Sequence, residues 1–267
     1  MNTLIVTGGS IDYKFACEYL KKYTWDYVVC ADAGMKFCHT AGIQPDLILG
    51  DFDSVDDASY TYFKETCPER MEQFPTHKDE TDTELALLRA IAAGADAVTM
   101  IGATGTRIDH LLGNIQMLKL ALDRGVPCQI VDAHNRIRMV DGQIMLQKSD
   151  QFGKYVSLLP FTPEVTGITL KGFAYEVENF TLVSGIARGV SNELEAETAR
   201  HYLSERYFAC NRVKGLVQRF RNERCTGNYN DRIKSNACET WCVILSAKAD
   251  IFFSESLHAT LRNGILL

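Results

Sequence analysis

The chain has 267 residues, 46% of them hydrophobic and 23% charged, which is typical of a globular protein with one large domain or two ordinary ones. Its formal net charge of −6 disfavours a broad nucleic-acid-binding surface, which needs a basic face. No apolar run reaches the roughly 18–20 residues that span a bilayer, and the first residues are typical of a strand rather than a signal peptide. Nine scattered cysteines favour reduced thiols, so we expect a cytoplasmic protein without membrane contact.

Short apolar runs alternate with helical patterns over the first half of the chain. Thr81 and Glu84 form the pattern of a capping box, which predicts a helix through Leu85, Leu88 and Ile91. Apolar residues also repeat at helical spacing over 108–122. Short apolar strands between helices indicate a parallel sheet that is covered on both faces. We therefore expect an α/β domain with a mostly parallel sheet over residues 1–134, its strands at 4–7, 27–30, 47–49, 97–101 and 129–131.

The pattern changes after residue 135. Short strand candidates follow one another, separated by turn residues and without a strong helical pattern until about residue 193. This is typical of an antiparallel β sandwich, which we assign to residues 135–213. Residues 214–267 form a further segment of unknown role, either an appendage, which we favour, or an insertion before a closing strand.

Acidic residues gather where strands end. Asp51 and Asp53 follow the strand at 47–49, and Asp82 falls in the first turn of its helix. Carboxylates placed together repel one another, and a divalent cation such as Mg²⁺, which prefers oxygen ligands, would relieve that repulsion. Because the strand ends of an open α/β sheet are where ligands bind, these residues indicate chemistry on a polyphosphate.

Each acidic cluster also has a purely structural explanation. Asp53 or Ser54 can cap a helix that begins near Val55. An acidic residue at position 82 complements the dipole of its own helix. Either cluster alone is more typical of structure than of function.

The segment at 102–107 joins a strand to a helix and contains two glycines and Arg107. Glycines allow the backbone to approach an anion, a helix N-terminus favours one, and the guanidinium group suits phosphate. His110 and Asn114 share a helix face with Arg107. A simple strand-to-helix turn with a surface arginine explains the pattern equally well. No Walker A sequence follows, and Gly8-Gly9-Ser10 is not a dinucleotide fingerprint.

Six segments combine these features in a specific order: Ala-Asp-Ala-Gly at 31–34, Pro-Asp-Leu-Ile-Leu-Gly-Asp-Phe-Asp-Ser at 45–54, His-Lys-Asp-Glu-Thr-Asp at 77–82, Gly-Ala-Thr-Gly-Thr-Arg-Ile-Asp-His at 102–110 with Asn114, Gly-Phe-Ala-Tyr at 172–175 and Gly-Val-Ser-Asn-Glu at 189–193. Together they resemble the thiamine pyrophosphokinase family over roughly residues 1–213. Two positions depart from the family pattern, since Ala33 and Thr106 stand where the family usually has glycine. An added side chain there would crowd a close contact between backbone and nucleotide.

The resemblance implies an ATP-binding α/β domain followed by a thiamine-binding β sandwich. It implies transfer of a pyrophosphoryl group from ATP to the thiamine hydroxyl, with release of AMP and formation of thiamine diphosphate. It also implies a Mg²⁺ cofactor and a homodimer that holds thiamine where the two subunits meet.

The same resemblance assigns roles to individual residues. Asp51, Asp53 and Asp82 would hold Mg²⁺, and with Arg107 and Asp109 they form the catalytic set. The residues expected at the nucleotide are Asp32, Lys78, Thr104 and Arg107, and those expected at thiamine are Tyr175, Ser191 and Asn192. A tyrosine face attracts a cation such as thiamine, although an exposed strand tyrosine and a turn or helix cap before Glu193 explain the last three equally well.

Two other functions fit the residues. One is a nucleotide-sugar glycosyltransferase that binds its metal through Asp51 and Asp53 and does not need Asp82 or Arg107 nearby. The other is a nucleotide sensor that keeps the pocket without turnover.

Overall fold

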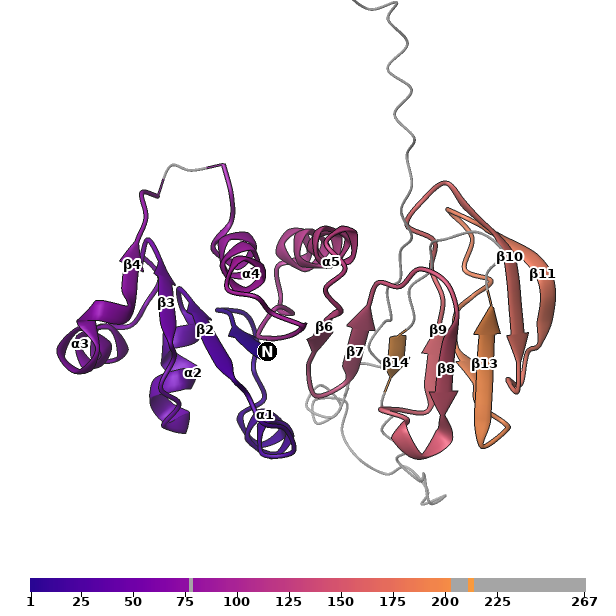
Figure 1. Ribbon diagram of the computed structural model, residues 1–267, viewed down its shortest axis with the longest axis horizontal. Helices are drawn as coiled ribbons and strands as arrows, with labels where there is room; N and C mark the ends of the chain where they lie inside the picture. Colours follow the sequence, from indigo (N-terminus) through magenta and orange to yellow (C-terminus); the bar gives the residue numbers. More distant parts are fainter. Residues whose placement is uncertain (77–78, 203–210, 214–267) are drawn as a thin grey trace, which may run out of the picture.

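The structure is a computed structural model that describes residues 1–76, 79–202 and 211–213. Its main feature is a ten-stranded sheet with the order β12-β9-β14-β7-β6-β5-β1-β2-β3-β4, which runs across the molecule in Figure 1. The strands are β1 (Asn2–Val6), β2 (Tyr27–Ala31), β3 (Leu47–Gly50), β4 (Met71–Gln73), β5 (Ala97–Ile101), β6 (Cys128–Val131), β7 (Asn135–Arg138), β9 (Tyr155–Ser157), β12 (Asn192–Glu193) and β14 (Asn211–Val213).

The strands from β6 to β4 in this order are all parallel. The chain starts at the centre with β1, adds β2, β3 and β4 on one side, and then returns to place β5 and β6 on the other. The order therefore reverses between β1 and β5. Such a switch point opens a crevice at the carboxyl ends of the strands, where ligands bind in sheets of this kind.

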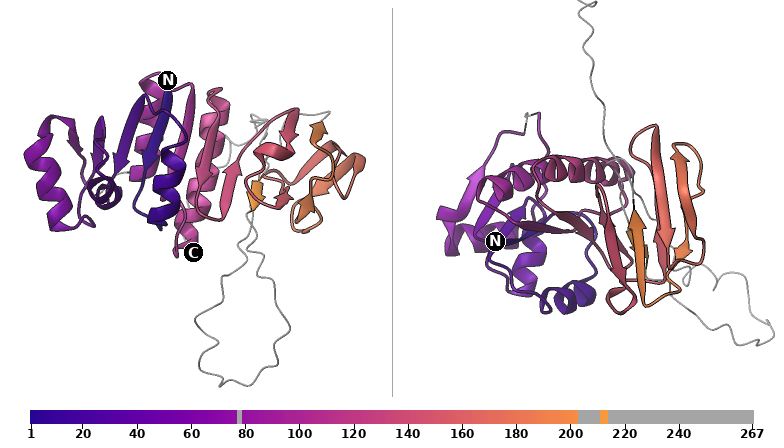
Figure 2. Two further views of the ribbon diagram at one scale, coloured as in Figure 1. Left: turned by 90° about the horizontal axis from the view of Figure 1, so that it is seen from below. Right: turned by 45° about the vertical axis from the view of Figure 1, so that its right-hand side comes forward.

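Helices cover both faces of the parallel half. Alternate residues of a strand point to opposite faces, and accordingly Ile5 packs into one core cluster while Leu4 and Val6 pack into another. The first cluster includes residues of α4 (Asp82–Ala92) and α5 (Ile108–Asp123), and the second includes residues of α1 (Tyr13–Leu20), α2 (Gly34–Ala41) and α3 (Asp57–Thr66). Figure 2 shows these two helical layers with the sheet between them. The predicted α/β domain with a mostly parallel sheet is confirmed.

The second half of the chain is antiparallel. β7 pairs antiparallel with β6, so the large sheet continues into this half without a break. A second sheet has the order β11-β10-β13-β8 and consists of β8 (Ile144–Gln147), β10 (Glu164–Lys171), β11 (Val177–Val183) and β13 (Thr198–Tyr202). Apolar residues of both layers, such as Val156 and Ile168, belong to one core cluster. This is the predicted antiparallel β sandwich.

The N-caps of α4 and α3 decide which helix starts predicted from the sequence are correct. The predicted helix and its N-cap are confirmed, since Thr81 caps α4 and its side chain accepts a hydrogen bond from the Glu84 N–H. A helix capped by Asp53 or Ser54 is wrong: α3 begins two residues later than expected and is capped by Asp56. The hydrogen bond from the Ser59 N–H lowers the pKa of Asp56 below its usual value.

The change from parallel to antiparallel pairing falls between Val131, which ends β6, and Asn135, which begins β7. The domain bounds of 1–134 and 135–213 agree with this position and stay a prediction. Residues 214–267 lie outside the described part of the chain, so the predicted appendage does too. Among the described residues, no helix is long and apolar enough to cross a bilayer.

Candidate active site

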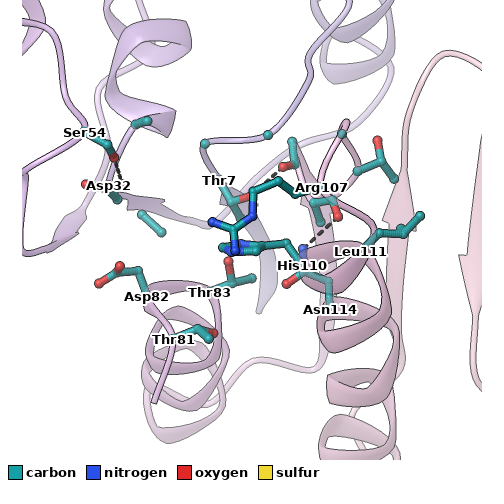
Figure 3. Close-up of a pocket in the computed structure, with 18 of the residues that line it drawn as sticks. Thr7, Asp32, Ser54, Thr81, Asp82, Thr83, Arg107, His110, Leu111 and Asn114 are labelled. Carbon is teal, nitrogen blue, oxygen red and sulfur yellow. Dashed lines mark hydrogen bonds between the residues drawn. The ribbon is translucent and has the colours of Figure 1, made fainter. Parts of the chain in front are cut away.

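A pocket of about 750 Å³ lies at the switch point. Its walls come from the chain just after β1, β2, β3 and β5, together with the first turns of α4 and α5, as shown in Figure 3. The lining side chains include three groups of predicted residues: the carboxylates Asp32, Asp51 and Asp82, the loop residue Thr104, and Arg107. Topology thus brings together segments that lie up to about a hundred residues apart.

Two loops on the floor of the pocket are joined by backbone hydrogen bonds. The Gly9 N–H donates to the Gly102 carbonyl at 2.8 Å, and the Ser10 N–H donates to the Thr104 carbonyl at 2.7 Å. The loops approach so closely that a Cβ built on Gly9 would lie 2.2 Å from the Gly102 oxygen. Glycine is therefore required at position 9 by packing between backbones.

Three carboxylates meet beside the pocket, and two of them, Asp32 and Asp51, line it. The chain turns at Phe52, which has φ +67°, and the Asp51 Oδ1 accepts a hydrogen bond from the Asp53 N–H at 3.1 Å. As a result, one ligand atom from each of Asp32, Asp51 and Asp53 lies within 4.8 Å of the others. Such a group of oxygen donors suits a hard divalent cation.

Asp32 is held in an unusual way. It has φ +45°, which is uncommon for a residue other than glycine. The Ser54 hydroxyl donates a hydrogen bond to its Oδ2, as Figure 3 shows, whereas its Oδ1 is buried without a hydrogen-bond partner. Since an unpaired buried oxygen costs about 1–3 kcal/mol, this carboxylate is prepared for a partner that the protein alone does not supply.

Repulsion among the acidic side chains raises the pKa of Asp53. The negative charge of Asp51 is the largest cause that raises the pKa of the Asp53 carboxyl above its usual value, and Asp32 and Asp82 add smaller contributions. Asp82 lines the same pocket from the start of α4, but it is not part of the group within 4.8 Å. The structure thus joins Asp51 and Asp53 to Asp32 more closely than to Asp82.

Arg107 stands at the N-terminus of α5 and extends into the pocket (Figure 3). Its guanidinium Nη2 lies 2.6 Å from the Asp109 Oδ2, and its Nε lies 3.3 Å from the Oδ1. The hydrogen bond from Arg107 lowers the pKa of Asp109 to about 2. Both side chains are about two-thirds exposed, so the pair orients the arginine and adds little stability. Lys78 lies outside the described residues.

The three residues predicted to bind thiamine lie in the β sandwich, and none of them lines this pocket. The Tyr175 side chain is 69% exposed. Both ends of the Asn192 amide bond to the Tyr175 backbone, its Oδ1 accepting from the N–H at 3.0 Å and its Nδ2 donating to the carbonyl at 2.9 Å. Asn192 therefore fixes the backbone that presents the tyrosine. Ser191 is exposed at φ +62°.

The predicted alternative of a helix cap before Glu193 is wrong, because residues 192–193 form β12. Asn192 and Tyr175 also border a small, mostly apolar cavity of about 70 Å³. The aromatic ring, the fixed backbone and this cavity form a second candidate surface on the sandwich.

Comparison with known proteins shows the family of the chain. The curated thiamine pyrophosphokinase of Bacillus subtilis is 33% identical over 193 residues, which cover 71% of this chain and 88% of that protein. The chain belongs to the thiamine pyrophosphokinase family. Two family models match it in succession, "Thiamin pyrophosphokinase, catalytic domain" over residues 19–130 and "Thiamin pyrophosphokinase, vitamin B1 binding domain" over residues 142–201.

Solved structures of the thiamine pyrophosphokinase family share the fold. The crystal structure from Bacillus subtilis has a TM-score of 0.73 at 29% identity and that from Geobacillus thermodenitrificans has 0.71 at 30%; each covers 81% of this chain and 99–100% of its own. The yeast enzyme, at 15% identity and a TM-score of 0.64, shares the fold alone. The match to the catalytic-domain model contains the acidic group, and the match to the second model contains Tyr175.

Three residues that line the pocket at the switch point have no predicted role in binding or catalysis. Ser54 bonds to Asp32, and Thr7 and Asn114 bond to the loop after β5. Asn114 has a weak signal in the sequence, because it lies on the same helix face as His110. Thr7 has none, because a threonine at the end of a strand is ordinary.

Proposed function

We propose that this protein transfers a pyrophosphoryl group from ATP to the hydroxyl of thiamine, which gives thiamine diphosphate and AMP. The observation that carries the proposal is the extent of the match to the Bacillus subtilis thiamine pyrophosphokinase, 88% of that protein at 33% identity. The pocket at the switch point supplies the groups that such a transfer requires. A glycosyltransferase is not favoured, because Asp82 and Arg107 line the same pocket as Asp51.

The polyphosphate of ATP fits the floor of the pocket. Backbone N–H groups after β5 and the N-terminus of α5 attract anions. Arg107 adds a cation with a fork of donors, already oriented by Asp109. In the transfer, the thiamine hydroxyl oxygen bonds to the β-phosphorus and its proton passes to solvent. At the same time the bond breaks between that phosphorus and the oxygen that bridges to the α-phosphorus. Negative charge builds on that bridging oxygen, and donors fixed in advance stabilise it.

We further propose that Mg²⁺ binds at Asp32, Asp51 and Asp53, with Asp82 close by. Support comes from the 4.8 Å grouping of the three carboxylates, from the unpartnered Oδ1 of Asp32 and from the raised pKa of Asp53. When bound, the ion supplies positive charge to the polyphosphate and to the leaving oxygen. The predicted Mg²⁺ ligands are Asp51, Asp53 and Asp82, and this proposal adds Asp32 to them. Lys78 and Thr104 stay proposals as nucleotide contacts.

Thiamine is proposed to bind at Tyr175, in a homodimer that places this residue near the pocket of the other subunit. In support, the residues that line the polyphosphate pocket all lie between 7 and 114, whereas Tyr175 is exposed on the sandwich and is not among them. A second subunit would bring a tyrosine to the pocket. A cation over a tyrosine ring gains about 0.5–2 kcal/mol. We assign Asn192 the role of holding Tyr175 in place and leave Ser191 as a proposed contact.

The cytoplasmic location likewise stays a proposal, supported by the five unpaired cysteines of the described chain.

A single assay tests the reaction. The protein is incubated with ATP and Mg²⁺, with and without thiamine, and AMP is measured. Release of AMP that depends on thiamine supports the proposal. Binding of ATP without release of AMP identifies a sensor instead, and turnover of a sugar nucleotide identifies a glycosyltransferase.

A mixing experiment tests the shared site. Asp51→Asn and Tyr175→Ala each impair a different half of the proposed site. If the site forms between subunits, mixed dimers of the two variants contain one intact site and regain activity. The assay uses thiamine concentrations well below the KM, where Tyr175→Ala is slow as well. If the mixed and re-equilibrated dimers are then no more active than the parent variants, each site lies within one chain.

A further inference from the structure

The loop after β5 has its carbonyl oxygens bonded one after another. The Ile101 carbonyl accepts from the Thr7 N–H at 2.9 Å, and the Gly102 carbonyl accepts from the Gly9 N–H and from the Thr7 Oγ1 at 2.7 Å. The next two carbonyls accept from the Asn114 Nδ2 and from the Ser10 N–H, each at 2.7 Å. Two of these donors are side chains, one just after β1 and one in α5, and Figure 3 shows both beside the pocket.

The same peptide planes carry the N–H groups of the loop. In a trans peptide the C=O of one residue and the N–H of the next point in opposite directions. Fixing the Gly102 carbonyl therefore fixes the Ala103 N–H, and fixing the Ala103 carbonyl fixes the Thr104 N–H. Within the described residues, the N–H groups of 103–106 donate to no protein acceptor, and all four residues line the pocket.

Both side chains are buried where they bond. Thr7 is 3% and Asn114 is 8% exposed, so water competes little for their hydrogen bonds. Asparagine has a poor helix propensity, and position 114 lies in the interior of α5. The Asn114 side chain therefore lowers the stability of α5, and its amide N–H group bonds to the loop after β5 rather than to the helix.

We propose that Thr7 and Asn114 are positioning residues for the polyphosphate: they fix the carbonyl side of the loop so that its N–H groups face the pocket as anion donors. This inference rests on the proposed function, because it specifies how the pocket selects phosphate groups. Neither residue needs to touch the ligand. Preorganised donors bind an anion more strongly than donors that must first be ordered.

Isosteric substitutions test the proposal, with a control in β1, the strand that leads to Thr7. Thr7→Val and Asn114→Leu remove the donors and keep the shape. The control is Thr3→Val, since the Thr3 hydroxyl is fully buried but has no hydrogen-bond partner. Thr7→Ser keeps the hydroxyl and serves as the conservative rescue.

The measurement is the affinity for inorganic tripolyphosphate and for Mg²⁺-ATP, by titration calorimetry. We expect Thr7→Val and Asn114→Leu each to weaken the binding of both ligands by about tenfold, of the order of one hydrogen bond between neutral groups. Thr3→Val and Thr7→Ser should bind as the natural protein does. In kinetic assays the KM for ATP should rise, whereas the KM for thiamine should change little.

Other outcomes overturn the proposal. If the variants lose thermal stability but bind tripolyphosphate within twofold of the natural protein, the two bonds serve folding alone. If Asn114→Leu does not fold, the Thr7→Val and Thr7→Ser pair decides by the same criterion. Because tripolyphosphate binding needs neither thiamine nor turnover, a failure of the proposed reaction is seen separately, as an absence of AMP in the natural protein.

Discussion

Substitution of Gly9 by alanine tests the close approach of the two pocket loops. A Cβ at this position would lie 2.2 Å from the Gly102 oxygen and 2.3 Å from the Thr104 oxygen. Both obstacles are backbone atoms, which cannot move aside as a flexible side chain would. The loops must separate by about 1 Å to restore an ordinary contact, and a hydrogen bond stretched beyond about 3.5 Å is lost.

The expected cost follows from the bonds between the loops. The Gly9 N–H to Gly102 bond is 2.8 Å long, and the bonds from the Ser10 N–H and the Thr7 Oγ1 are 2.7 Å long. A separation of about 1 Å breaks all three. At about 1 kcal/mol for each, Gly9→Ala should lower the free energy of unfolding by roughly 3 kcal/mol, and it should also abolish tripolyphosphate binding.

Urea unfolding followed by far-UV circular dichroism measures the free energy. The matched control is Gly113→Ala in α5, where an added Cβ would meet nothing within 4 Å. This control should raise stability by about 0.5–1 kcal/mol, because alanine is the better helix former. A loss below about 1 kcal/mol for Gly9→Ala, with tripolyphosphate binding intact, would refute the argument that packing between the loops requires glycine.

Three further outcomes are expected. Asp82→Asn should lower kcat far more than it lowers the melting temperature; activity within about threefold of the natural protein, roughly 0.65 kcal/mol of barrier, would remove Asp82 from the proposed site. Tyr175→Ala should raise the KM for thiamine about tenfold, near 1.4 kcal/mol, and leave ATP binding intact; an unchanged KM would exclude the ring contact. Burial lowers the pKa of His201 from 6.5 to about 4, so the unfolded chain binds more protons between these values and stability falls as the pH drops. The loss at about pH 5 should be roughly 2 kcal/mol, and His201→Leu should flatten that part of the stability profile.

Much of the architecture is predictable from the sequence because it depends on local patterns of apolar and helix-capping residues. Buried parallel strands are short apolar runs, and the N-cap at Thr81 marks the start of α4. Very short strands have no such pattern. β4, β12 and β14 have only two or three residues each, and they form because the neighbouring strands are already in place.

The site is predictable only in its parts. The sequence places Asp51 and Asp53 two residues apart, and their carboxylates meet because the chain turns at Phe52. The sequence does not indicate that Asp32 joins them, since that contact depends on β2 and β3 being neighbours and on the bond from Ser54. The roles of Thr7 and Asn114 likewise require the register of β1 against β5.

The position of β14 has a consequence for how the polypeptide matures on the ribosome. This last described strand lies between β7 and β9, although β9 is synthesised more than fifty residues before it. Until residues 211–213 have left the exit tunnel, β7 and β9 each present an open edge, and such edges recruit strands from other molecules. The α/β half can be complete while the sandwich still lacks the strand at 211–213. A nascent chain arrested before residue 211 should therefore be the species that associates with chaperones, and release of a few more residues should end that association.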